Sequence, residues 1–198
     1  TGTINTAAEV QRFLDRVPED VLIVLDEAYV EFVDSPDYPD MIAELRAGRK
    51  NIIVLRTFAK IYGLAGLRVG YAFAAPEIIS YLDRARPTFN VNALAQIGAT
   101  AALQDDQHLV QSRAHAAASR EYFVREFAAM GLEPIPSYTN FIAVHVGDDM
   151  AVTTALMDNG ITVSPLGGWG LPGYIRISYG THEENERFFV ALRKVLAS

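Results

Sequence analysis

Two short, uninterrupted apolar runs constrain the fold of this chain more than any other feature. The first, Val21–Leu25, is followed directly by Asp26 and Glu27, and the second, Ile52–Leu55, lies in a predicted strand from Asn51 to Arg56. Strands that are apolar along their whole length are typical of parallel sheets with both faces covered. We therefore predict that both runs form fully buried parallel strands of an α/β sheet.

The segments around these runs fit the same class. A third strand is predicted at Val69–Ala74, after a stretch in which glycines stand at positions 63, 66 and 70. From Asn92 to Met130 the pattern is helical, with a break near residues 104–106 that predicts two helices. Strands that alternate with helices indicate an α/β sheet with right-handed crossovers.

Beyond Gly131 the pattern changes to a smaller α+β region. A final helix is predicted after Thr181, where Glu184 three residues later makes a capping box. The other expected elements are one helix (Ala151–Asn159) and three strands (Asn140–Val146, Ile161–Val163 and Tyr174–Tyr179). We predict a boundary near residue 105, with part of a large domain in residues 1–105. Residues 106–198 would form a small domain that includes the connecting helix.

Composition limits the classes of function. The net charge of −7 disfavours a nucleic-acid surface, which needs a basic face. No apolar run approaches the roughly 20 residues of a membrane span, so we expect a cytoplasmic protein. The absence of cysteine excludes disulfides and zinc–thiolate sites. The four histidines lack metal-ligand spacing, and we predict no metal site (His108, His115, His145 and His182).

An acid and an amine are expected at the same edge of the predicted sheet. Asp26 ends the first buried strand, while Thr57 and Lys60 follow the second. Ligands of open α/β sheets bind beyond the carboxyl ends of the strands. A lysine that faces an aspartate there suits pyridoxal 5′-phosphate (PLP), because the amine forms a Schiff base and the carboxylate pairs with the pyridinium nitrogen.

Two segments carry a resemblance to a known family. Asp26–Tyr29 resembles the D-x-A-Y segment of aminotransferases of PLP fold type I, and residues 56–71 (RTFAKIYGLAGLRVGY) closely resemble their lysine segment. The resemblance implies that Lys60 holds the cofactor and that Asp26 pairs with its ring nitrogen. It also implies that Tyr29 donates to the ring oxygen, and that the phosphate is held by Thr57 and Arg68. The implied fold is the C-terminal part of the three-layer large domain plus a small α+β domain.

Within this family, the chain is most similar to histidinol-phosphate aminotransferases. Pro165–Gly173 resembles their glycine-rich stretch, and Ser137 with Asn140-Phe141 resembles their S-x-x-N-F segment. Arg176 matches the arginine that binds the anionic group of the substrate. Aromatic amino-acid aminotransferases share nearly all of these motifs, so that substrate class stays open.

Two positions depart from the family pattern, and the start of the chain is a third departure. Ala59 stands where a serine usually precedes the lysine, and Ser164 stands where an arginine is frequent. Thr1-Gly2-Thr3 matches the end of the N-P-x-x-P-T-G segment, whose asparagine would lie upstream. We therefore expect the chain to be part of a longer protein and its site to be incomplete.

The function implied by the resemblance is transamination between histidinol phosphate and 2-oxoglutarate, a step of histidine biosynthesis, in a homodimer. One alternative from another class is a P-loop ATPase fragment, with Val21–Glu27 as a Walker B strand. No G-x-x-x-x-G-K-[ST] segment accompanies that strand. A non-catalytic protein of the same fold is a further alternative, against which Lys60 counts.

Overall fold

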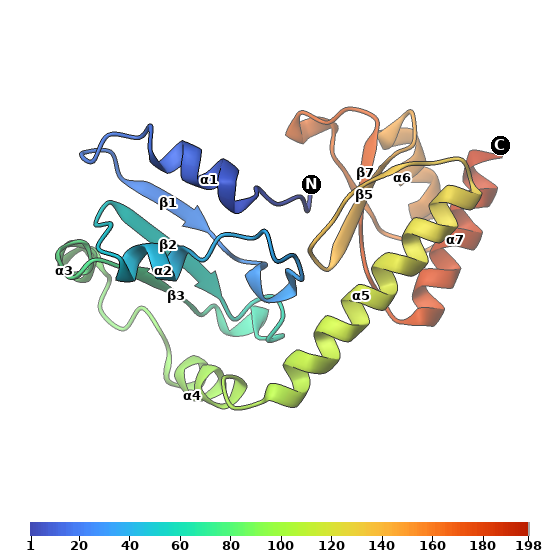
Figure 1. Ribbon diagram of the computed structural model, residues 1–198. Coiled ribbons are helices and arrows are strands. Elements are labelled where there is room, and N and C mark those ends of the chain that lie inside the picture. The colour runs from blue at the N-terminus through green and yellow to red at the C-terminus, as the bar shows by residue number, and fades with distance from the viewer. Residues whose placement is uncertain (198) are drawn as a thin grey trace. The chain divides into compact units, whose positions relative to one another are not determined.

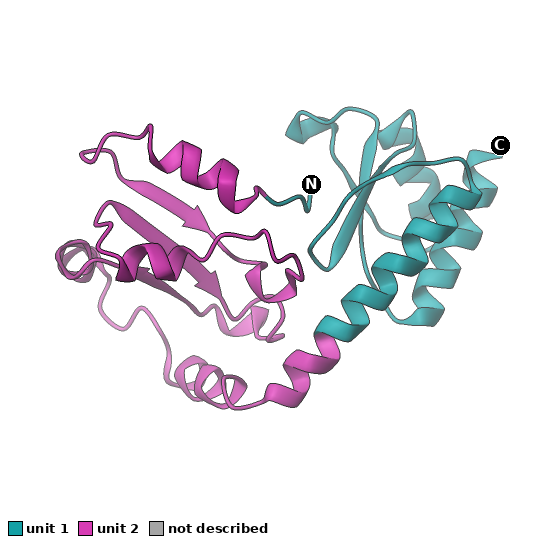
Figure 2. Cartoon of the chain, viewed as in Figure 1, with its two compact units in different colours: residues 1–4, 113–198 teal, residues 5–112 magenta. Residues whose placement is uncertain are grey.

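The structure is a computed structural model that describes residues 1–197, and the chain divides into two compact units (Figure 2). One unit comprises residues 5–112, and the other comprises residues 1–4 together with residues 113–198. The division falls inside a long helix rather than at residue 105. The domain ranges 1–105 and 106–198 thus stay a prediction, and each unit is described by itself.

The unit of residues 5–112 is built on a three-stranded sheet in the order β1-β2-β3 (Figure 1). Strands β1 (Ile23–Asp26) and β2 (Ile52–Thr57) are parallel, as predicted. Strand β3 (Gly70–Ala74) runs antiparallel to β2. The segment between β2 and β3 contains only the 3₁₀ helix η2 (Ala65–Leu67) and reverses the chain directly. A parallel neighbour would require a longer crossover.

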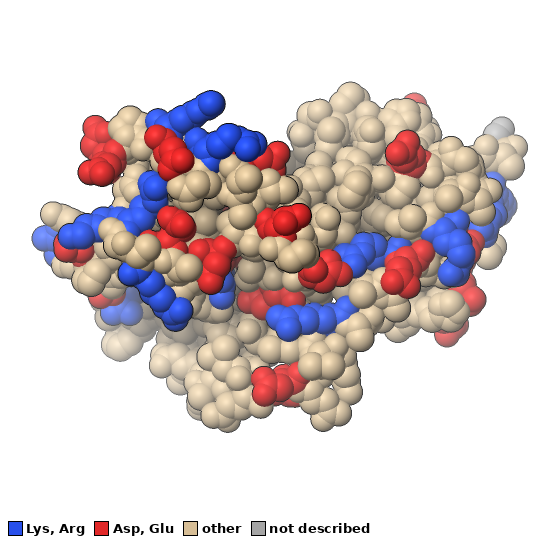
Figure 3. Space-filling view, in the orientation of Figure 1, with Lys and Arg blue, Asp and Glu red and all other residues tan. Residues whose placement is uncertain are grey.

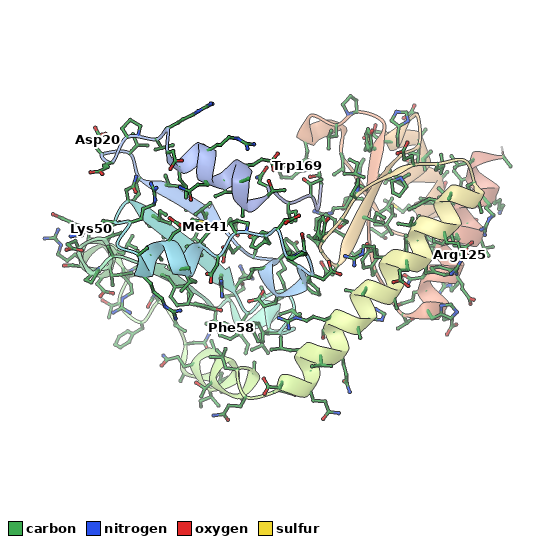
Figure 4. All side chains as sticks on the ribbon, viewed as in Figure 1. Asp20, Met41, Lys50, Phe58, Arg125 and Trp169 are labelled. Atoms are coloured by element: carbon green, nitrogen blue, oxygen red, sulfur yellow. The ribbon has the colours of Figure 1, made fainter. Side chains whose placement is uncertain are left out.

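Helices cover one face of this sheet. From α1 (Ala7–Leu14) and α2 (Met41–Arg46), the side chains of Leu14 and Met41 pack with Ile23, Ile52 and Val54 in one buried cluster. Met41 is labelled in Figure 4. The remaining helical elements of the unit are η1 (Val30–Phe32), α3 (Pro76–Ala85) and α4 (Ala93–Ala102).

The prediction that the first strand is buried on both faces is wrong. In β1, Val24 is 55% exposed while its neighbour Ile23 is buried; in β2, Leu55 is 36% exposed while Ile52, Ile53 and Val54 are buried. Successive side chains of a strand point to opposite faces of the sheet. Since α1 and α2 both pack on the face of Ile23 and Val54, Val24 and Leu55 on the opposite face stay exposed in the described chain, although Ile53 on that face is buried.

The second unit is a four-stranded antiparallel sheet with helices. Its strands are β4 (Pro134–Ile135), β5 (Phe141–His145), β6 (Ser164–Pro165) and β7 (Tyr174–Ser178), in the order β4-β5-β7-β6. Its other elements are α5 (Asp106–Ala129, from residue 113 onward), α6 (Asp149–Asp158), η3 (Gly167–Trp169) and α7 (His182–Leu196).

An aromatic core holds the second unit together. Phe123 and Phe127 of α5 pack against Phe188 and Phe189 of α7, and the rings of Phe123 and Phe188 stack at 5.6 Å. One face of the sheet completes the cluster with four aliphatic side chains (Ile142, Val144, Ile175 and Ile177). The capping box predicted at Thr181 is present, and it fixes the start of α7.

The strand predicted at Ile161–Val163 is absent, and the structure places β6 at Ser164–Pro165 instead. The amide of Ile161 donates to the carbonyl of Leu156 at 3.0 Å, across Gly160, whose φ is +76°. This bond belongs to the C-terminal cap of α6. The backbone here completes the helix, and pairing with β7 begins only at Ser164.

No helix among the described residues is long and apolar enough to cross a membrane. On the face that Figure 3 draws, the blue basic side chains lie interspersed with the red acidic ones.

Candidate active site

The side chains of Asp26 and Thr57 belong to the same edge and the same face of the three-stranded sheet. Asp26 is in register with Leu55 across the parallel pair β1–β2, and both strands end at this edge. Thr57 lies two residues beyond Leu55, so it shares the face of Leu55 and Asp26. One carboxylate oxygen of Asp26 accepts a hydrogen bond from the amide of Ala28 at 3.0 Å, which turns the chain after β1.

Lys60 lies next to Tyr29 beyond the same strand ends. The Nζ of Lys60 is 4.9 Å from the centre of the Tyr29 ring, a cation–π contact between two half-buried side chains. Phe58, labelled in Figure 4, is 4% exposed and anchors the start of the turn that carries Lys60. Two residues predicted from separate motifs are thus in direct contact.

The backbone around Lys60 is held by a set of short hydrogen bonds. The Oγ1 of Thr57 accepts from the amide of Ala59 at 3.0 Å and lies 3.5 Å from the carbonyl of Val69. The amide of Gly63 donates to the carbonyl of Lys60 at 2.9 Å, which closes the turn. The bond to Thr57 uses only the backbone of Ala59, so this contact does not require the serine that is usual there.

Arg68 lies on the return path of the chain to the same edge. It precedes by two residues Gly70, which pairs with Thr57 in the antiparallel ladder. Its backbone is left-handed, with φ +54° and ψ +55°, and its guanidinium donates to the carbonyl of Ala65 at 2.9 Å. Its side chain is exposed and available to an anion. A non-glycine residue in this region is uncommon and marks a constrained turn.

Arg176 belongs to the other unit. It faces Ala143 and Ser164 on the two neighbouring strands, and its guanidinium lies 4.9 Å from the centre of the Phe141 ring. Ile175 and Ile177 point into the core on the opposite face, as the predicted alternation requires. The pairing places Ser164, one of the departures from the family pattern, directly beside Arg176.

A buried ion pair that the sequence did not suggest lies on the other face of the three-stranded sheet. The Nε of Arg56 donates a hydrogen bond to Oε2 of Glu27 at 2.9 Å, and Nη2 lies 2.8 Å from the same oxygen as an ion pair. Strand alternation puts this pair opposite Asp26 and Thr57. Burial raises the pKa of Glu27, and the bond to Arg56 offsets this rise only in part. The signal available in the sequence was strand alternation, which turns Glu27 and Arg56 to the face opposite Asp26 and Thr57.

No group of histidine and carboxylate side chains in the described part of the chain could hold a metal ion. Five candidate residues, by contrast, belong to strand ends or turns at one sheet edge, and two of them, Tyr29 and Lys60, are in direct contact (Asp26, Tyr29, Thr57, Lys60 and Arg68).

The family profile described as aminotransferase class I and II matches residues 1–192. The chain belongs to this aminotransferase family. It is also similar to two proteins named histidinol-phosphate aminotransferase. The one from Anaeromyxobacter sp. strain Fw109-5 is 46% identical, with 100% of this chain and 55% of the relative covered. The one from Moorella thermoacetica is 46% identical, with coverages of 100% and 51%.

Solved aminotransferase structures have the same fold. Histidinol-phosphate aminotransferase from Sinorhizobium meliloti, in complex with pyridoxal-5′-phosphate, superimposes with a TM-score of 0.87 at 34% identity. That superposition covers 100% of this chain and 54% of the solved chain. The predicted family and the predicted α/β fold class are confirmed. The chain spans about half the length of the curated relatives it matches.

The Walker B interpretation of Val21–Glu27 finds no support in the aminotransferase chain. Its acidic residue Glu27 is 4% exposed and bound to Arg56, so it does not face the edge where a nucleotide-bound cation would lie.

Proposed function

We propose that the full-length protein is a PLP-dependent aminotransferase that moves an amino group between histidinol phosphate and 2-oxoglutarate. The observation that supports this most is the contact of Lys60 with Tyr29 at the sheet edge where Asp26 and Thr57 lie. The identity of 46% to two enzymes named for this activity extends over the whole chain and favours this substrate.

The side chains at this edge suit PLP chemically. Lys60 offers an amine for the cofactor aldehyde, and Asp26 offers a carboxylate for a ring nitrogen. Thr57 and Arg68 offer a hydroxyl and a guanidinium for a phosphate. Gly70 must lack a side chain, because a Cβ there would lie 2.8 Å from the carbonyl oxygen of Arg56. When bound, the cofactor supplies an electron sink that stabilises negative charge at the substrate α-carbon.

Lys60 has two roles in this proposal. Its amine holds the cofactor before the substrate arrives. Once released, the same amine takes the proton from the substrate α-carbon, which requires it to be neutral at that moment. Asp26 would pair with the ring nitrogen and favour its protonated form, and Tyr29 would donate a hydrogen bond from its hydroxyl to the ring oxygen.

The partners of the protein are part of the same proposal. Arg176 binds the anionic group of the amino donor or of the 2-oxo acid through its planar guanidinium. We further infer a homodimer and a cytoplasmic location. An aromatic amino-acid donor is the second candidate, because the neighbour of Arg176 across the strands is the uncharged Ser164.

A visible absorption spectrum with added PLP tests the role of Lys60. We expect the full-length wild type to show a band of lysine-bound cofactor, and Lys60→Ala to lose both the band and transamination. Lys50→Ala is the matched control, since Lys50 is 76% exposed and lies away from the carboxyl edge of β2 (Figure 4). A wild type without a band, or normal turnover by Lys60→Ala, contradicts the proposal.

Amino-donor kinetics test the substrate. Histidinol phosphate is expected to give a far higher kcat/KM than phenylalanine or tyrosine, and comparable turnover of phenylalanine would favour the aromatic alternative. Arg176→Gln should raise the KM for the anionic donor by about 10- to 100-fold, as expected for lost charge-assisted hydrogen bonds. Arg187→Gln, a change at an exposed position of α7, should leave the KM unchanged.

A further inference from the structure

One histidine reaches the turn that carries Lys60. The Nε2 of His108, in the first turn of α5, lies 2.7 Å from the carbonyl oxygen of Ile61. A carbonyl only accepts, so this nitrogen must carry the proton and donate it. The two residues are 47 positions apart in the sequence but belong to the same compact unit.

The bonded carbonyl belongs to a well-anchored residue. Ile61 follows Lys60 directly, and its side chain is 3% exposed. Two further hydrogen bonds close the same turn, from the amide of Gly63 to the carbonyl of Lys60 and from the amide of Leu64 to that of Phe58, each at 2.9 Å. The donation from His108 therefore acts on a peptide group whose neighbours fix where the Lys60 side chain leaves the backbone.

His108 is itself held in place. The amide of His108 donates to the carboxylate of Asp105 at 2.9 Å, which fixes the start of α5. The preceding helix α4 holds the other end of the lysine segment, where a side chain on Gly98 would lie 2.8 Å from Leu67 and Asn92 donates to the carbonyl of Leu67 at 3.4 Å. Helices α5 and α4 thus contact the lysine segment on both sides of Gly63, at Ile61 and at Leu67.

We propose that His108 is a positioning residue for Lys60, acting through the carbonyl of Ile61. This inference rests on the proposed function, since it assigns His108 to the group that holds the cofactor. His108 does not act on the substrate or the cofactor itself. It keeps the peptide group between Ile61 and Tyr62 in one orientation and so restrains the turn that carries Lys60, so that the amine stays beside Tyr29 instead of sampling other directions.

Hydrogen–deuterium exchange in the cofactor-free, full-length protein tests the contact between His108 and Ile61 without an activity assay. His108→Leu removes the donor, and the amides of Gly63 and Leu64 should then exchange about 3- to 10-fold faster, the range expected for one neutral hydrogen bond. His108→Gln keeps an N–H donor and should exchange like the wild type. His115→Leu is the matched control on the exposed face of α5. Unchanged exchange in His108→Leu would overturn the proposal.

Cofactor binding provides the second readout. His108→Leu should weaken the affinity for PLP about 3- to 10-fold and reduce the visible band at a fixed PLP concentration. His108→Gln should restore both, which a loss of general stability would not allow. If His108→Gln is as impaired as His108→Leu, the positioning role is wrong. If amide exchange rises in His108→Leu as expected while the wild type shows no PLP band, the role of His108 in holding the turn is supported and the proposed function is contradicted.

Discussion

Replacement of Arg56 by glutamine should destabilise the protein far more than the same replacement of its partner Glu27. The Glu27 side chain is 3% exposed, and it accepts a hydrogen bond and an ion-pair contact from Arg56, which is itself 23% exposed. Arg56→Gln leaves a buried carboxylate without its cation. Glu27→Gln removes the buried charge and keeps an oxygen that can accept from Arg56.

The magnitudes follow from this asymmetry. Removal of one partner from a buried ion pair costs about 3–5 kcal/mol. Because Arg56 keeps some contact with water, we expect about 2–4 kcal/mol for Arg56→Gln at pH 7.5. Burial already raises the pKa of Glu27, so its charge is disfavoured in the folded state. Glu27→Gln should therefore cost about 1 kcal/mol or less.

The pH dependence has a definite sign. Arg56 lowers the pKa of Glu27, and the nearby Asp40 raises it, so loss of Arg56 moves that pKa further above 4.5. A carboxyl whose pKa is raised by folding contributes stability that is present below its unfolded pKa and is lost as the pH rises through the folded pKa. The cost of Arg56→Gln should thus shrink between pH 8 and pH 5, by at most about 1.4 kcal/mol per pH unit. Tyr38 stays neutral throughout, since burial raises its pKa to about 12.

Urea unfolding of the full-length protein at pH 5 to 8 measures these differences. The series comprises wild type, Arg56→Gln, Glu27→Gln and the double variant, with the exposed Arg46→Gln as control for the loss of one positive charge. The double variant should lie near Glu27→Gln rather than at the sum of the single changes. Equal costs for the two single changes at pH 7.5, or a cost of Arg56→Gln that does not depend on pH, would refute this reasoning.

Three further changes test the second unit. Phe123→Ala should lower the free energy of unfolding by about 3–5 kcal/mol, as large-to-small changes of buried aromatic residues do, and a melting temperature equal to the wild type would contradict this. Asp149→Ala removes the carboxylate that accepts from the amides of Gly167 and Gly173 at 2.8 and 3.2 Å, so the loop between them should loosen. Fluorescence anisotropy of the single tryptophan, Trp169, should fall in this variant, whereas an unchanged value would count against the pinning of the loop. Thr181→Ala should cost about 1 kcal/mol through the lost cap of α7, a loss that Thr181→Ser should largely restore in chemical unfolding.

Local signals predicted much of the fold. The parallel pair β1–β2 followed from its apolar runs, and the start of α7 followed from Thr181 and Glu184. Helix α3 was missed, although Pro76 at its first position and Glu77 in its first turn are recognisable start signals. The wrong prediction of a strand at 161–163 shows that a short apolar run can follow the C-terminal cap of a helix instead of pairing in a β-sheet.

Long-range contacts could not be predicted in the same way. The pairing of Glu27 with Arg56 spans 29 positions, and that of His108 with Ile61 spans 47. Alternation indicates which face Glu27 and Arg56 share, but not that they pair, and the contact of His108 has no local signal at all, because each contact depends on how separate elements pack. The spacing of the four histidines predicted only that His108 is not a metal ligand.

The two faces of the sheet explain why neighbouring acidic residues take different roles. Asp26 and Glu27 are adjacent, but alternation turns Asp26 towards the face of Thr57 and Glu27 towards the face of Arg56. Arg56 and Thr57 divide in the same way on the next strand. The ion pair therefore joins β1 to β2 behind the candidate site, and each of its members is the chain neighbour of a proposed cofactor ligand. A shift of one residue in the strand register would exchange the two faces, so the pair that stabilises the sheet also fixes which side chains face the candidate site.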